Sequence, residues 1–204
     1  MSGPAVDHLL VATADLDAAA ATVGRLGLEV AAGGRHPGWG TANRIAPLGD
    51  AYLELIGVVE PSETASSPFG AWVAASPPGP LGWAVRVEDI DATARRLGLG
   101  IVPGSRATPD GRTLRWRTAG VERVAAEPSL PFFIEWEPGT PFPGAGGAGL
   151  AIERIQLRGD AARLGEWLGE AELPVTVRPG PSAVERFVLR AADGAVMIDA
   201  STVV

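Results

Sequence analysis

The feature that most constrains the fold is an internal repeat. Three segments each begin with an apolar or alternating run, VDHLLVA, GWAVRVE or LAIERIQL, and each run is followed by an aspartate before a short amphipathic stretch. The aspartates Asp15, Asp89 and Asp160 recur about every 70 residues, which indicates one structural unit repeated three times. Each is predicted to cap a helix, with Asp17 and Asp91 as alternative caps in the first two copies.

Each predicted helix ends near a glycine, at Gly27, Gly98 and Gly169 in turn. Three strand-like runs then follow in every copy, so the unit reads as βαβββ. The predicted fold class is therefore α+β with three such modules. Because one four-stranded sheet with one helix leaves a face uncovered, two modules are expected to pair. Together they form a curved, barrel-like sheet with an open cleft and helices outside.

Two segments rich in proline, glycine and small residues separate the modules. Residues 60–80 and 139–149 are predicted linkers. They divide the chain into module one at 1–59, module two at 81–138 and a βαβββ-like module three at 150–204. Modules one and two are expected to form one unit around the cleft. The odd third module is expected either to cover a sheet edge or to pair with a second chain as a homodimer.

Composition excludes several classes of protein. The 204 residues include no cysteine, which excludes disulfides and thiolate metal ligands, and no lysine, which excludes a Schiff base or a P-loop. The net charge of −7 argues against a nucleic-acid partner. No run approaches the ~20 apolar residues that span a bilayer, and the first residues do not resemble a signal peptide. We therefore expect no membrane partner and a cytoplasmic location.

The first candidate site residues are carboxylates in otherwise apolar strands. Glu54 lies in AYLELIGV and Glu135 in PFFIEWE, each on the last strand of its module. Alternation places Tyr52 on the face of Glu54, and Phe133 on the face of Glu135. A buried carboxylate must be protonated, paired or bound to a cation. Both glutamates are therefore expected either to face the shared cleft or to pair with arginine.

One histidine stands where it can meet these carboxylates. His8 lies on the first strand of module one, which can neighbour the last strand of that module. His8 and Glu54 can then converge, with Glu135 reaching them across the module interface. One imidazole and two carboxylates suit a divalent metal such as Zn, Mn, Fe or Ni, with open positions for a substrate. The alternative is a structural histidine with a satisfied ring.

A glycine-rich segment and one arginine supply candidate ligand contacts. The segment GGRHPGWGTANR contains His36, Trp39 and Asn43, which are residue types that determine specificity. The alternative is a hairpin loop with His36 in solvent. Arg86, on the first strand of module two, is expected to clamp a ligand carboxylate or to pair with Glu135.

The order of these motifs resembles the glyoxalase-like domain family of the vicinal oxygen chelate superfamily. The resemblance covers about Val6 to Pro138 and is carried by DHL, GGRHPGWGTANRIAPLGDAYLELI, GWAVRVEDID, TPDGRTLRWRTAG and LPFFIEWE. It implies metal ligands on the first and last strands of two paired modules, here His8, Glu54 and Glu135. The position of module two that matches His8 is Gly82, which has no side-chain ligand.

The resemblance implies metal-dependent lyase, isomerase or dioxygenase chemistry on a small oxygenated metabolite, with Glu135 as the acid or base. A second reading is a metal-free protein that binds or sequesters a small molecule, of the bleomycin-resistance type. A third is a structural module whose cleft is filled by an Arg86–Glu135 pair. Gly82 favours the last two readings, and the two mid-strand glutamates favour the first. The candidate substrate contacts are His36, Trp39, Asn43, Tyr52, Arg86 and Phe133.

Overall fold

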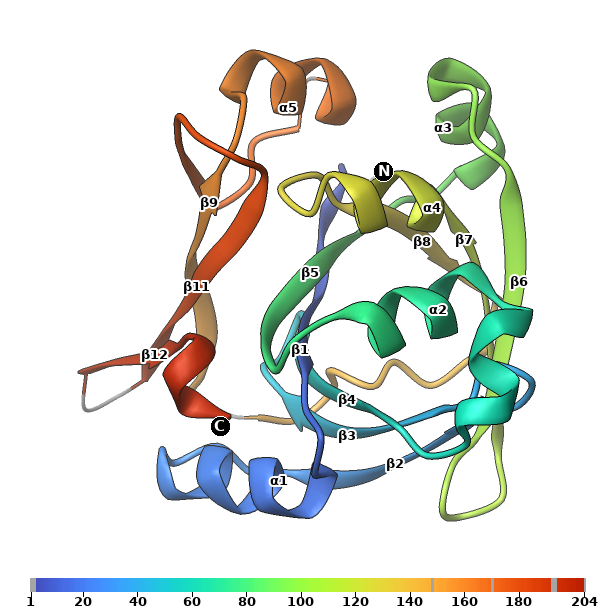
Figure 1. Cartoon of the computed structure of the whole chain (residues 1–204), viewed down its shortest axis with the longest axis vertical. Helices are drawn as coiled ribbons and strands as arrows, with labels where there is room; N and C mark the ends of the chain where they lie inside the picture. The colour runs from blue at the N-terminus through green and yellow to red at the C-terminus, as the bar shows by residue number, and fades with distance from the viewer. Residues whose placement is uncertain (1–2, 148, 170, 192–193, 204) are drawn as a thin grey trace.

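Two β-sheets form most of the structure, a computed structural model that describes residues 3–147, 149–169, 171–191 and 194–203 (Figure 1). The larger sheet has eight strands in the order β2-β3-β4-β1-β5-β8-β7-β6, and the smaller has four in the order β10-β9-β11-β12. The strands are β1 Ala5–Ala12, β2 Ala31–His36, β3 Thr41–Pro47, β4 Tyr52–Val58, β5 Gly79–Arg86, β6 Ile101–Ala107, β7 Thr113–Ala119, β8 Phe132–Trp136, β9 Ala151–Arg158, β10 Val175–Arg178, β11 Ala183–Ala191 and β12 Gly194–Ile198.

The larger sheet consists of two equivalent halves. The first strands of modules one and two, β1 and β5, pair antiparallel at its centre, and each half continues outward in the same order. The edge strands β2 and β6 meet at a seam, where a Cβ on Gly34 would lie 2.3 Å from the carbonyl oxygen of Ala107. Glycine permits this approach, so the sheet closes almost completely into a barrel. The predicted α+β class with a barrel-like sheet is confirmed.

Three helices lie outside the sheets and begin where the sequence predicts. They are α1 (Leu16–Arg25), α3 (Ile90–Leu97) and α5 (Ala161–Leu168). The carboxylates of Asp15, Asp89 and Asp160 accept hydrogen bonds from backbone N–H groups of the first helical turns. No helix in the described part of the chain is long and apolar enough to cross a membrane.

The segment 60–80, predicted to be a linker, contains two helices. They are the 3₁₀ helix η1 (Pro61–Ser66) and α2 (Pro68–Ala75), and α2 lies across the opening of the barrel (Figure 1). Ser67 caps α2, and the apolar run that follows buries Phe69 and Trp72. A Cβ on Gly82 would lie only 2.5 Å from the Trp72 ring. The expected open cleft is therefore partly filled by α2.

The third module has the predicted element order but a different strand pairing. Its second strand, β10, lies parallel to its first, β9, instead of beside its third. The module packs on the outer face of module two, where Trp167 of α5 stacks on Phe133 with ring centroids 6.0 Å apart. The indole of Trp167 also donates a 2.8 Å hydrogen bond to the Pro131 carbonyl. The odd module thus packs within its own chain, and a homodimer stays a prediction.

The structure also contains two further short helices. Helix α4 (Val121–Ala126) follows β7, and the 3₁₀ helix η2 (Ala200–Thr202) follows β12. Helix α4 lies beside α2 at the mouth of the barrel (Figure 1). Both helices contribute side chains to one pocket at this end of the barrel.

Candidate functional site

A small cavity of about 30 Å³ lies inside the barrel; we call it the inner cavity. Such a volume holds roughly two water molecules. Its charged and amide side chains are each no more than 5% exposed: His8, His36, Asn43, Glu54 and Arg106. Six aromatic rings surround them: Trp39, Tyr52, Phe69, Trp116, Phe132 and Trp136. The inner cavity therefore combines buried ionisable groups with apolar walls, which is typical of a ligand site.

Glu54 is the shared partner within this cluster. Its Oε1 accepts a 2.7 Å hydrogen bond from the Asn43 amide, and its Oε2 lies 3.5 Å from Nε2 of His8. Nε2 of His36 lies 3.9 Å from Oε1. These contacts follow from strand order, because β4 lies between β1 and β3. The buried carboxylate thus finds its partners within module one.

Two glycines on β2 determine the position of Asn43. A Cβ on Gly33 would lie 1.9 Å from the Asn43 side-chain oxygen, which no side chain permits. The backbone N–H of Gly34 donates a 2.8 Å hydrogen bond to the same oxygen. Because the oxygen is held in this way, the amide nitrogen of Asn43 is directed to Glu54. The GGRH sequence is therefore part of the site rather than a solvent loop.

His8 is oriented by Asp7, which the sequence pattern did not mark as a site residue. The pairing of β1 with β5 is irregular at Asp7, as in a β-bulge, and Asp7 is completely buried. Its Oδ1 lies 2.7 Å from Nδ1 of His8. Its Oδ2 accepts a 2.9 Å hydrogen bond from the Trp136 indole. Asp7 therefore fixes the orientation of the His8 ring, which places Nε2 on the side of Glu54.

The second histidine is neutral because it is buried. Nδ1 of His36 lies 2.9 Å from the Thr41 hydroxyl. Burial lowers the pKa of His36 to about 4, although the nearby Glu54 acts in the opposite direction. Burial also raises the pKa of Tyr52, whose ring stacks on His8 with centroids 4.7 Å apart. Both side chains are therefore uncharged near neutral pH.

Module two places no carboxylate in the inner cavity. The β8 residues that line it are Phe132, Ile134 and Trp136. Glu135 and Phe133 consequently lie on the opposite face, where Glu135 forms an ion pair with Arg117. The expectation that Glu135 and Phe133 face the cleft is corrected here. The side chains of β8 do alternate between the two faces of the sheet, but the set that faces the cavity is the one that does not contain Glu135.

Arg86 also lies outside the lining of the inner cavity. Its Nη1 is 3.4 Å from Oδ2 of Asp7, and its Nη2 donates to the Asp50 carbonyl at 3.3 Å. Its guanidinium lies 4.5 Å from the centre of the Phe142 ring. Arg86 therefore supports Asp7 and does not form the expected pair with Glu135. The predicted residues that do line the cavity are His8, His36, Trp39, Asn43, Tyr52 and Glu54.

The superfamily's divalent metal does not fit these residues. Module two offers Gly82 where a second histidine would stand, and the Trp72 ring occupies the space beside it. On β8 the inward position offers Ile134, since Glu135 faces away. Within the described ranges, no group of three histidine, aspartate or glutamate side chains is placed to hold a metal ion. Two of the four expected ligand positions therefore lack a donor.

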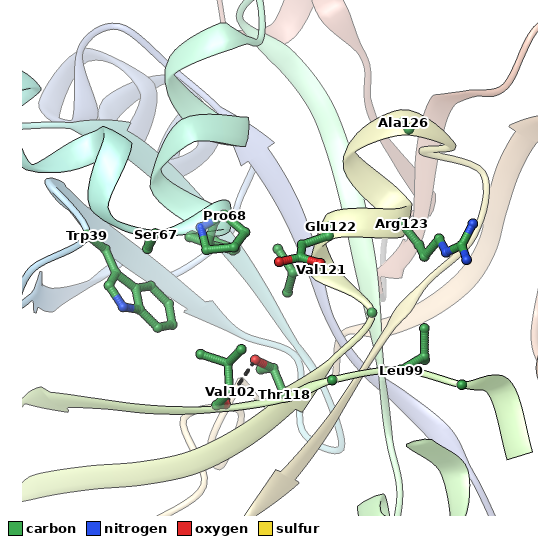
Figure 2. A pocket seen from close by; sticks show the side chains of 14 residues that line it. Trp39, Ser67, Pro68, Leu99, Val102, Thr118, Val121, Glu122, Arg123 and Ala126 are labelled. Carbon is green, nitrogen blue, oxygen red and sulfur yellow. Dashed lines mark hydrogen bonds between the residues drawn. The ribbon is translucent and has the colours of Figure 1, made fainter. Parts of the chain in front are cut away.

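A larger pocket of about 500 Å³ adjoins the inner cavity (Figure 2); we call it the outer pocket. Figure 2 shows Ser67 and Pro68 above Val102, with Glu122 of α4 beside Pro68. The two spaces share four lining side chains: Trp39, Phe69, Thr118 and Val121. These side chains border both the outer pocket and the inner cavity that holds the buried polar cluster.

Comparison with known proteins agrees with this architecture. A family model described as a glyoxalase-like domain matches residues 6–172. A hypothetical protein from Staphylococcus aureus has a similar structure, with a TM-score of 0.76 and 15% identity over 94% of this chain and 92% of that chain. That similarity includes the third module. At such an identity it supports the fold alone.

Methylmalonyl-CoA epimerase from Mycobacterium tuberculosis is also similar, with a TM-score of 0.46 and 22% identity over 66% of this chain and 88% of that chain. No curated protein matches the sequence. The family match spans most of the chain and agrees with the paired modules around β1 and β5. The chain therefore belongs to the glyoxalase-like domain family, with the fold of the vicinal oxygen chelate superfamily.

Proposed function

We propose that this protein binds a small oxygenated organic molecule without a metal. The body of the ligand occupies the outer pocket, and its polar end reaches the inner cavity. The observation that carries this proposal is that Trp39, Phe69, Thr118 and Val121 line both spaces, which therefore adjoin. The 500 Å³ volume lies within the range of small-molecule sites.

The absence of fitting metal ligands in module two separates this proposal from the metal-dependent chemistry of the superfamily. Gly82 and Ile134 supply no donor atoms, and Asn43 already binds one oxygen of Glu54. The other polar groups that line the inner cavity are imidazole, hydroxyl and guanidinium groups, which bind oxygen atoms by hydrogen bonding. Such a site recognises carbonyl and carboxylate groups directly.

The proposal is tested by measuring ligand-dependent melting temperatures in the presence of EDTA. The probes are pyruvate, phenylpyruvate, phenylacetate, hydroxyacetone and catechol. A ligand that binds only the native state raises the melting temperature. At least one probe should do so without metal.

A matched pair of variants locates the binding. Val102→Trp fills the outer pocket, whereas Val59→Trp changes a similarly exposed valine outside it. The rise should disappear in Val102→Trp and persist in Val59→Trp. A rise that requires added Mn²⁺ or Zn²⁺, or no rise with any probe, contradicts the proposal.

A second function, proton transfer at carbon, is favoured by the buried Asp7. The Asp7 carboxylate contacts Nδ1 of His8 at 2.7 Å and fixes the ring, as a partner orients a general base. Nε2 can then take a proton from the carbon next to a ligand carbonyl and return it, which isomerises the ligand.

The test is exchange of the methylene protons of phenylpyruvate with deuterium oxide, followed by NMR. Exchange should exceed the uncatalysed rate and fall to it in His8→Gln. Equal rates in the two proteins contradict this second function.

A further inference from the structure

Arg106 is a buried cation that forms no ion pair with the residues that the structure describes. It lies on β6, 5% exposed, and lines the inner cavity. Among the described residues, none forms an ion pair within 4.0 Å or a side-chain hydrogen bond with the guanidinium, whose nitrogen atoms keep slight contact with solvent. The other ionisable side chains of the cavity have polar contacts, since Glu54 accepts from Asn43 and His36 contacts Thr41. Burial of an unpaired charge is costly unless a ligand compensates for it.

Arg106 lies at the barrel seam, and its neighbours are residues of the seam and of the inner cavity. A Cβ on Gly34 of β2 would lie 3.4 Å from Nη1 of Arg106. Arg106 also acts electrostatically on His36 and Tyr52, both of which line the inner cavity. The guanidinium thus lies among the cavity side chains and is not held by a surface partner.

We infer that Arg106 binds the carboxylate of an anionic ligand whose body fills the outer pocket. This inference rests on the proposed function and names the ligand class. The inner cavity of about 30 Å³ suits two carboxylate oxygens, in the place of roughly two waters, better than a tetrahedral phosphate. A guanidinium also matches a carboxylate with two parallel hydrogen bonds. Glu54 lies in the same cavity, but its Oε1 accepts a hydrogen bond from Asn43 and it forms no ion pair with Arg106, which leaves Arg106 for the ligand.

The test uses pairs of probes that differ only in charge: phenylacetate with phenylacetamide, and pyruvate with pyruvamide. Isothermal titration calorimetry in EDTA should give at least one acid with an affinity about tenfold or more above its amide, as expected for a charged hydrogen bond. Arg106→Met should remove this preference. Arg115→Met, which changes an exposed arginine on the paired strand β7, should retain it.

The outcomes separate the inference from the proposed function. Equal binding of acids and amides overturns the role of Arg106 and leaves the pocket as a ligand site. Binding of neither member of any pair overturns both. A preference that survives in Arg106→Met overturns the assignment to Arg106, and tighter binding of phenyl phosphate than of phenylacetate overturns the carboxylate.

The stability of Arg106→Met without ligand gives an independent reading. If Arg106 awaits a ligand, its removal should leave the melting temperature unchanged or raise it, because an unpaired buried charge is lost. If Arg106 instead neutralises Glu54 at long range, the melting temperature should fall. It should then recover in the double variant with Glu54→Gln, and that result overturns the inference.

Discussion

The amide of Asn43 donates a 2.7 Å hydrogen bond to the carboxylate of Glu54, and both side chains are at least 95% buried. Asn43→Ala removes the donor and leaves a buried carboxylate with one fewer partner. We expect a loss of about 3 kcal/mol in the free energy of unfolding, measured with urea. In a Glu54→Gln background the same substitution should cost clearly less. Equal costs in the two backgrounds would contradict the pairing.

The neutral state of His36 makes stability depend on pH. Its pKa falls from 6.5 to about 4 on folding, so the unfolded chain binds the proton more tightly. The resulting stabilisation, about 3 kcal/mol, is complete above pH 6.5 and is lost as the pH falls to 4. His36→Gln should reduce the loss of stability between pH 6.5 and 4 by this amount. Asp110, Glu185 and Asp199, whose pKa values are lowered, titrate equally in both proteins.

Chemical denaturation of both proteins at several pH values gives this comparison. Parallel stability curves for the native protein and His36→Gln would show that His36 does not titrate differently in the folded state.

The ring of Trp72 occupies the space beside Gly82, so a side chain at this position would collide with it. Gly82→Ala places a Cβ about where the Trp72 ring lies, so we expect a cost of about 1–3 kcal/mol from overpacking. Trp72→Phe shortens the ring, so Gly82→Ala should cost less in that background. A double-mutant cycle measured by urea unfolding gives the coupling. Strict additivity would mean that the two residues do not compete for space.

The position of Glu135 yields a prediction that separates the two faces of β8. Glu135 pairs with Arg117 outside the cavity, whereas Glu54 lines it. Glu135→Gln should therefore leave ligand affinity and the melting temperature nearly unchanged, since partly exposed ion pairs contribute little. Glu54→Gln should change ligand affinity. The reverse pattern in calorimetric titrations would restore Glu135 to the site.

Much of the fold was predictable because its signals are local. Asp15 and Asp89 cap helices through their own side chains, and the strands carry clear apolar runs. The pairing of modules followed from the need to cover a sheet face. The strand order of module three was not predictable, because the choice of β10 or β11 as the neighbour of β9 depends on packing against the rest of the chain.

The site was predictable only for module one. His8 and Glu54 stand out as charged residues in apolar strands, and strand order brings them together. The segment PFFIEWE, which contains β8, has apolar residues on both faces of the strand, because module three also covers the outer face at Phe133. Alternation therefore gave no sign of which face Glu135 takes. Arg106 carried no signal at all, because its burial depends on closure of the β2–β6 seam.

The most direct test of metal-free ligand binding is a crystal structure grown with Mn²⁺ and phenylacetate, with anomalous diffraction measured for manganese. We predict no anomalous peak between His8 and Glu54, and ligand oxygens in the inner cavity beside Arg106. A manganese peak held by His8 and Glu54 would contradict the account and return the protein to the metal-dependent chemistry of its superfamily.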